Sequence, residues 1–139
     1  MSAKHTPQLL RSAPYFPVAD LEQSAVHYER VFGFHRDYVG GKPPEFVILS
    51  RDGLSIMLRT VLEPGHIRPN EKQGGTWDVF FWVRHVDDLH EELRNNGADV
   101  VYGPIFQAAY NMNEFAVRDR EGYVLGFGEV ADGGGSSEQ

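Results

Sequence analysis

The feature that most constrains the fold of this chain is a supersecondary unit that occurs twice. In each copy an apolar stretch ends in Val, an acidic residue opens an amphipathic helical stretch, a Gly follows, and strand-like segments then surround an Asp-Gly or Glu-Gly turn. The interval from the valine to the glycine is nearly equal in the two copies, Val18 to Gly33 and Val83 to Gly97. A repeat of this length predicts two pseudo-symmetric modules, and such pairs usually hold a ligand between them.

Each copy has a pattern that predicts the element order βαβββ. Asp20 is the expected N-cap of the first helix, with Gln23 three residues later, and Asp87 or Asp88 is expected to cap the second. Asp52 begins an Asp-Gly hairpin turn. One such module cannot bury both faces of its sheet. We therefore expect an α+β fold whose modules form a curved mixed sheet, with the helices outside and a concave cavity inside.

The predicted organisation along the chain has five segments. They are an N-terminal arm, the first βαβββ module, a linker or flap, the second module and a tail, at residues 1–11, 12–61, 62–76, 77–130 and 131–139. The arm is either loose or a strand that pairs with a neighbouring subunit. The linker is rich in Pro and Gly. The tail contains consecutive Gly and Ser, which predicts disorder.

The composition narrows the classes of function. The 139 residues include no Cys, which excludes disulfides, thiol nucleophiles and thiolate metal sites. The net charge of −7 argues against nucleic acid and anionic membranes as partners and weakly favours a cationic one. No apolar run approaches the ~20 residues that span a bilayer. The N-terminus has no apolar core typical of a signal peptide, so we expect a cytoplasmic protein.

Two motifs resemble the vicinal-oxygen-chelate superfamily of glyoxalases, extradiol dioxygenases and bleomycin-resistance proteins. The first is Phe-Pro-Val-Ala-Asp-Leu at residues 16–21, followed by Tyr28 and by Val-Phe-Gly-Phe at residues 31–34. The second, at residues 115–123, resembles the superfamily's Phe-x-x-x-Asp-Pro-x-Gly-Asn segment before its last strand. The resemblance covers residues 12–129 and implies the glyoxalase/bleomycin-resistance fold. That fold hosts binding proteins and several chemistries, so it does not assign a function by itself.

Metal-dependent members of this superfamily carry one ligand, usually His or Glu, at each of four inward-facing positions. Counting from the valine and the turn glycine of each module places these positions at Ala13, Met57, Asp78 and Gly126. One carboxylate cannot form a divalent site with three or four ligands. The absence of this ligand set from the sequence predicts a protein that holds no metal or other cofactor, and we assign no catalytic residue. In this respect the chain is similar to one branch of the superfamily, the bleomycin-resistance branch, whose members bind cationic glycopeptide drugs in clefts of a dimer.

Strand alternation and the resemblance together predict a set of ligand-binding residues. They are Tyr15, Met57, Arg59, Asp78, Phe80, Trp82, Tyr110 and Glu114. An aromatic and partly polar cavity suits a planar or amphipathic ligand.

For each of these side chains a structural role is the alternative. Phe80 and Trp82 are equally compatible with a core or a dimer interface. Asp78 could form a salt bridge with Arg59 or bond a neighbouring strand, and Arg59 could instead orient an anionic ligand group. Glu114 could lie in a solvated loop.

Three functions fit this sequence. The first is a homodimeric, metal-independent binding protein of the bleomycin-resistance type, which sequesters an amphipathic, aromatic or cationic compound at a dimer cleft. The resemblance to that type associates such binding with antibiotic resistance, and the sequence leaves the biological role open. The second is a divergent metal-dependent glyoxalase-like lyase, isomerase or dioxygenase, with a metal held by Asp78 together with Glu114 or with residues of a second subunit. The third is a degenerate domain for protein interaction or regulation, whose own side chains fill the cavity.

Overall fold

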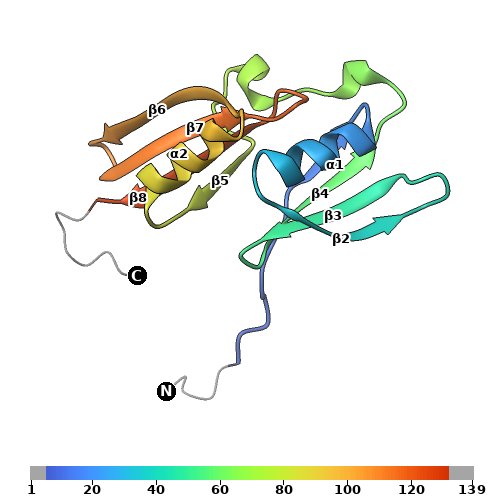
Figure 1. Cartoon of the computed structure of the whole chain (residues 1–139), viewed down its shortest axis with the longest axis horizontal. Helices are drawn as coiled ribbons and strands as arrows, with labels where there is room; N and C mark the ends of the chain where they lie inside the picture. Colours follow the sequence, from blue (N-terminus) through green and yellow to red (C-terminus); the bar gives the residue numbers. More distant parts are fainter. Residues whose placement is uncertain (1–5, 132–139) are drawn as a thin grey trace.

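The computed structural model describes residues 6–131 (Figure 1). The first five residues of the predicted arm lie outside the described part, as does the predicted disordered tail apart from Ala131. The first half of the chain contains β1 (Tyr15–Val18), α1 (Leu21–Arg30), β2 (His35–Gly40), β3 (Phe46–Arg51) and β4 (Leu54–Thr60). The second half contains β5 (Val79–Trp82), α2 (Val86–Asn95), β6 (Asp99–Gln107), β7 (Met112–Arg118) and β8 (Val124–Val130). Two short 3-10 turns, η2 (Pro64–His66) and η3 (Asn70–Gln73), connect the halves.

The predicted βαβββ order and the α+β class are confirmed, and each module has its own sheet. The strand orders are β1-β4-β3-β2 and β5-β8-β7-β6. In each sheet the first strand runs parallel to the last, and the remaining pairs are antiparallel. Within residues 6–131 no ladder joins the modules, so the expected single curved sheet is two separate sheets in one chain. β1 and β5 are consequently free edges.

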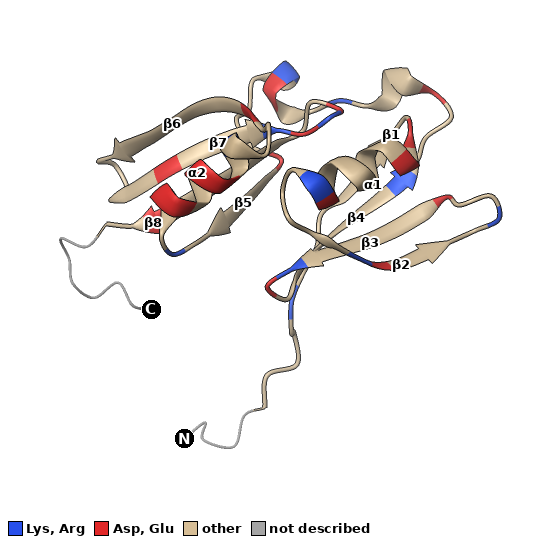
Figure 2. Ribbon diagram, in the orientation of Figure 1, with Lys and Arg blue, Asp and Glu red and all other residues tan. Residues whose placement is uncertain are grey.

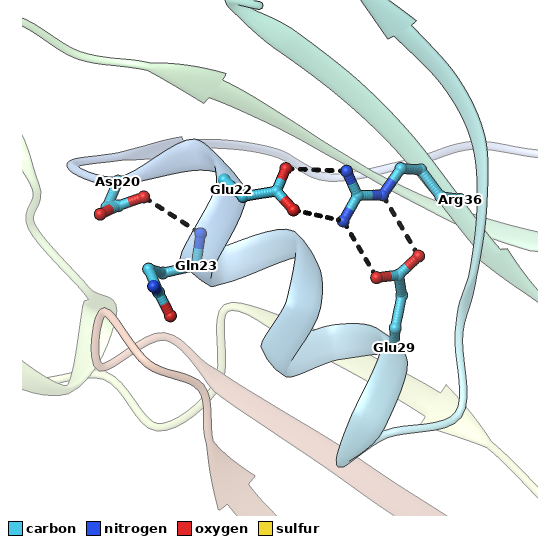
Figure 3. Close-up of polar contacts among 5 residues, drawn as sticks. All are labelled: Asp20, Glu22, Gln23, Glu29 and Arg36. Carbon is cyan, nitrogen blue, oxygen red and sulfur yellow. Dashed lines mark hydrogen bonds and ion pairs between the residues drawn. The ribbon is translucent and has the colours of Figure 1, made fainter.

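The first helix begins where the sequence predicts. Asp20 is the N-cap, and its carboxylate accepts a hydrogen bond from the Gln23 amide at 3.0 Å. The outer side of α1 is tied to β2, because the Arg36 guanidinium contacts Glu22 at 2.9 Å and Glu29 at 3.0 Å (Figure 3). The pairs are partly solvent-exposed, so each adds at most about 1 kcal/mol.

The second helix is capped differently from the prediction. Its N-cap is His85, in a left-handed conformation with φ of 56°, and neither Asp87 nor Asp88 occupies that position. The first free amide of the helix, that of Val86, donates instead to the Glu129 carboxylate of β8 at 3.0 Å. Asp87 and Asp88 lie in the first turn, where acidic side chains favour the helix dipole. Figure 2 shows the acidic residues along α2.

The two modules share one hydrophobic core. It joins buried side chains of β1, α1, β3 and β4 to those of α2, β7 and β8. The rings of Phe16 and Tyr123 stack across the modules, with centroids 4.2 Å apart, and the Tyr123 hydroxyl donates to the Pro17 carbonyl at 2.8 Å. The Tyr28 hydroxyl of α1 donates to Asp119 at 2.6 Å.

Both helices lie at the contact between the modules rather than outside a common cavity. The side chain of Asn96, which ends α2, donates to the carbonyl of Val31, which ends α1, at 3.2 Å. Each helix covers one face of its own sheet (Figure 1). We name the opposite face of each sheet its open face.

Part of the predicted linker is anchored to the second module. The Asp78 carboxylate accepts the amide of Asn70 in η3 and the amide of Val124 in β8, both at 2.9 Å. Glu71 in the same turn pairs with Arg118 of β7 at 2.7 Å. These contacts argue against free movement of η3 as a flap.

Candidate ligand-binding face

The open face of the first sheet collects three of the predicted residues. Tyr15 and Met57 are register partners on β1 and β4, and Arg59 lies two residues further along β4. The Arg59 guanidinium lies 5.7 Å from the centre of the Tyr15 ring, a cation–π distance. Phe46 of β3, which the sequence did not suggest, packs its ring edge against Tyr15 with centroids 6.0 Å apart. The four residues form a small aromatic and cationic patch.

The open face of the second sheet is built from two adjacent rows of register partners. The first row runs across β6, β7, β8 and β5 through Tyr102, Ala116, Gly126 and Phe80. The second row runs across the same strands through Ile105, Glu114, Gly128 and Trp82. Three aromatic side chains and Ile105 at the edges therefore surround a centre of small residues and one carboxylate.

The aromatic side chains contact one another over the small residues. The Phe80 centroid lies 4.7 Å from that of Trp77 and 5.2 Å from that of Trp82, in edge-to-face geometry. Trp82 is 68% exposed, so this large apolar surface faces solvent in the single chain. Trp82 therefore does not fill the core, which is the alternative role considered for it.

Glu114 is fully buried on β7. The alternative that it lies in a solvated loop is therefore wrong. The Tyr102 hydroxyl donates to Oε2 at 2.5 Å and the Tyr110 hydroxyl donates to Oε1 at 2.8 Å. The Trp77 indole N–H donates to the Tyr102 hydroxyl at 2.8 Å. Burial, followed by the bond to Glu114, raises the pKa of both tyrosines. We name these four side chains the Glu114 network.

The predicted ligand-binding set does not include Tyr102, for an identifiable reason. The sequence alone suggests a strand at residues 100–102 and a loop or turn at residues 105–113. β6 instead continues to Gln107, with a register shift between Tyr102 and Ile105 that keeps the strand paired with β7. The contact of Tyr102 with Glu114 could be found only from that irregular pairing, whereas Tyr110 is among the predicted residues.

The four positions of the superfamily's metal ligands do not fit a metal centre here. Both Asp78 oxygens accept backbone amides, which matches the alternative of a bond to a neighbouring strand and not a salt bridge with Arg59. A Cβ atom on Gly126 would lie 2.6 Å from Trp77 Cδ1 and 2.8 Å from Phe80 Cδ2, so the two rings cover this position. Between residues 6 and 131 no three His, Asp or Glu side chains are grouped so as to hold a metal ion.

The predicted site residues thus fall into two groups and one separate residue. Tyr15, Met57 and Arg59 lie on the first open face, and Phe80, Trp82, Tyr110 and Glu114 belong to the second module. Asp78 anchors the linker. In the described part of the chain, the aromatic and hydrogen-bond contacts of each group stay within its own module.

A further cavity lies in the groove between the modules on the helix side. It measures about 660 Å³, within the usual range for ligand sites. Its floor is apolar, with Phe34, Phe81 and Phe127, and Arg51 pairs with Glu92 at 3.0 Å on its rim. Of the eight predicted ligand-binding residues, only Trp82 lines it.

Comparison with known proteins agrees with this geometry. Residues 10–127 match the model of the Glyoxalase/Bleomycin resistance protein/Dioxygenase superfamily. The chain therefore belongs to this superfamily. A search of curated protein sequences found no match. None of the described helices is long and apolar enough to span a membrane.

Several solved structures share the fold. TioX from Micromonospora sp. ML1 is 23% identical, with a TM-score of 0.69 over 88% of this chain and 99% of TioX. TnmS3, an antibiotic binding protein from Streptomyces sp. CB03234, is 19% identical, with a TM-score of 0.68 over 91% of this chain and all (100%) of TnmS3. A glyoxalase-related enzyme from Clostridium phytofermentans is 14% identical, with a TM-score of 0.65 over 91% of this chain and 99% of that protein. At these identities the likeness concerns the fold alone.

Proposed function

We propose that this protein is a metal-independent binding protein that sequesters an amphipathic aromatic or cationic compound in the cytoplasm. The observation that carries the proposal is the second open face, where Trp77 and Phe80 cover the position of a superfamily metal ligand. A face of aromatic rings around a carboxylate offers stacking surface and negative charge and has no grouped metal ligands. The structural likeness to TnmS3, named as an antibiotic binding protein, supports an antibiotic as the sequestered compound.

The proposed site is completed by a second copy of the chain. The free edges β1 and β5 carry Tyr15, which is 54% exposed, and Trp82. Exposed aromatic surface at an unpaired strand edge is typical of an interface. If β1 of one copy lies beside β5 of the other, the patch around Arg59 faces the Glu114 network across one cleft.

The N-terminal arm is a further element of the proposed dimer. Leu9 and Leu10 are 96% and 85% exposed, which leaves two adjacent apolar side chains without cover in the single chain. We expect the arm to pack against the second copy and to stabilise the dimer. The side chains of Tyr15 on β1 and Trp82 on β5 would then be enclosed together with the ligand.

Intrinsic fluorescence tests the binding proposal directly. The chain has 2 Trp residues, and both Trp77 and Trp82 lie at the second open face. We expect saturable quenching with bleomycin or with planar aromatic amines, and quenching that persists after treatment with a chelator. Absence of quenching by every compound, or its loss with chelator, would contradict the proposed function.

The oligomeric state is tested by sedimentation equilibrium of the full chain. We expect a dimer that is weakened by Leu10→Asp in the arm. Leu62→Asp is the matched control, because Leu62 is 92% exposed but lies in the linker. A wild-type monomer at all concentrations, or equal effects of the two substitutions, would refute the assigned role of the arm.

A further inference from the structure

The Glu114 network contains a buried carboxylate without a positively charged partner. Glu114 has no exposed surface, and among residues 6–131 its side chain takes part in no ion pair. Each of its oxygens accepts one phenol hydroxyl, from Tyr102 and from Tyr110. Taking a carboxylate out of water costs free energy unless hydrogen bonds and opposite charge compensate for the lost hydration. A positive charge placed next to the network would lower the cost of this buried anion.

The direction of these hydrogen bonds fixes what the tyrosine oxygens can do. An ionised carboxylate only accepts, and a phenol has a single hydrogen. Both hydroxyl groups therefore donate their single hydrogen to Glu114. The Tyr102 oxygen already accepts the Trp77 indole N–H. The Tyr110 oxygen is left with free acceptor capacity, and the Tyr110 side chain is 45% exposed.

Glu114 thus makes Tyr110 a hydrogen-bond acceptor that cannot act as a donor toward a ligand. The rings of Trp77, Phe80 and Trp82 lie on the same open face and offer π surface, to which organic cations are attracted. An anionic group at this place would meet the negative charge of Glu114 and an acceptor oxygen. A neutral group without a donor would leave the remaining acceptor capacity of the Tyr110 oxygen without a partner.

We propose that the Glu114 network selects ligands in which a protonated amine, or another strong hydrogen-bond donor, is attached to an aromatic ring. The amine donates to the Tyr110 hydroxyl, and the ring packs on Trp77, Phe80 and Trp82. Glu114 acts through Tyr110 and is a positioning residue. This inference rests on the proposed binding function and specifies the ligand class at that same site.

Three naphthalene probes of similar size and different polarity test it. Naphthylmethylammonium carries a cationic donor, naphthylmethanol a neutral hydroxyl and naphthoate an anion, and calorimetric titration of the full chain gives the affinity for each. We expect the ammonium to bind at least about tenfold more tightly than the alcohol, and the carboxylate to bind most weakly, because hydrogen bonds with a charged partner are the stronger ones.

Two substitutions assign the preference to the network. Glu114→Gln removes the charge and adds an amide N–H that donates to one tyrosine oxygen, so we expect about a tenfold loss for the ammonium and a small change for the alcohol. Tyr110→Phe removes the acceptor and should give the same selective loss if Glu114→Gln does not fold. Glu91→Gln is the control, because Glu91 is an exposed residue of α2, the helix on the opposite face of this sheet.

The outcomes separate this inference from the function on which it rests. If all three probes bind with similar affinity, and the substitutions reduce them equally, the aromatic site stands and the donor selectivity is refuted. If Glu91→Gln weakens the ammonium as much as Glu114→Gln does, the preference arises from overall charge, which also refutes it. If no probe binds to the wild type, both the proposed function and the inference are overturned.

Discussion

Replacement of Gly126 by Ala tests the packing on which the interpretation of the open face depends. Gly126 lies at a superfamily metal-ligand position, and its backbone is not in the left-handed region, so the added methyl group causes no backbone strain. The new Cβ would lie 2.6 Å from Trp77 Cδ1 and 2.8 Å from Phe80 Cδ2, distances that real Cβ atoms do not show. One or both rings must move.

The expected cost follows from this overlap. Overpacking by one methyl group typically lowers the free energy of unfolding by about 1–3 kcal/mol. Displacement of Trp77 also breaks its hydrogen bond with Tyr102 and so disturbs the Glu114 network. We therefore expect Gly126→Ala to lower the stability in urea titration, to shift the tryptophan emission and to weaken the binding of the ammonium probe.

A matched glycine provides the control. A methyl group added at Gly65 in η2 would have no atom within 4 Å, and the residue has no positive φ, so Gly65→Ala should leave stability and emission unchanged. Equal stability and equal emission spectra of Gly126→Ala and the wild type would refute the reasoning, because they would mean that Trp77 and Phe80 do not cover this position.

Two further predictions concern pH and metal. Burial raises the pKa of Asp119 from 3.8 to about 6, so its contribution to stability is fully present below pH 3.8 and is lost as the pH rises through about 6. The free energy of unfolding should therefore fall by up to about 3 kcal/mol over that interval relative to Asp119→Asn, and parallel curves for the two proteins would contradict this assignment. After loading with nickel, zinc, iron or manganese and desalting, we expect far less than one metal per chain by elemental analysis. Stoichiometric retention would favour the enzyme alternative.

Part of the fold follows from local sequence patterns. The helix start at Asp20, the hairpin at Asp52 and the βαβββ order of each module depend on capping, turn chemistry and side-chain periodicity. The loss of the usual His or Glu ligands at the superfamily's metal positions, Ala13, Met57, Asp78 and Gly126, is also visible in the sequence. These positions are found by counting residues within each motif. The cap of α2 differs from the local prediction because Glu129, far along the chain, accepts the first helical amide.

Much of the candidate site was decided by tertiary structure. The shared core places both helices at the contact between the modules and leaves the opposite faces of the sheets open. β6 continues beyond Gly103 through a register shift, which brings Tyr102 to Glu114 and buries the carboxylate. Local sequence determines which elements form, because their hydrogen bonds and turns are short-range. Which faces meet, and which polar group finds its partner, depends on contacts between residues distant in the chain, whose register no local pattern encodes.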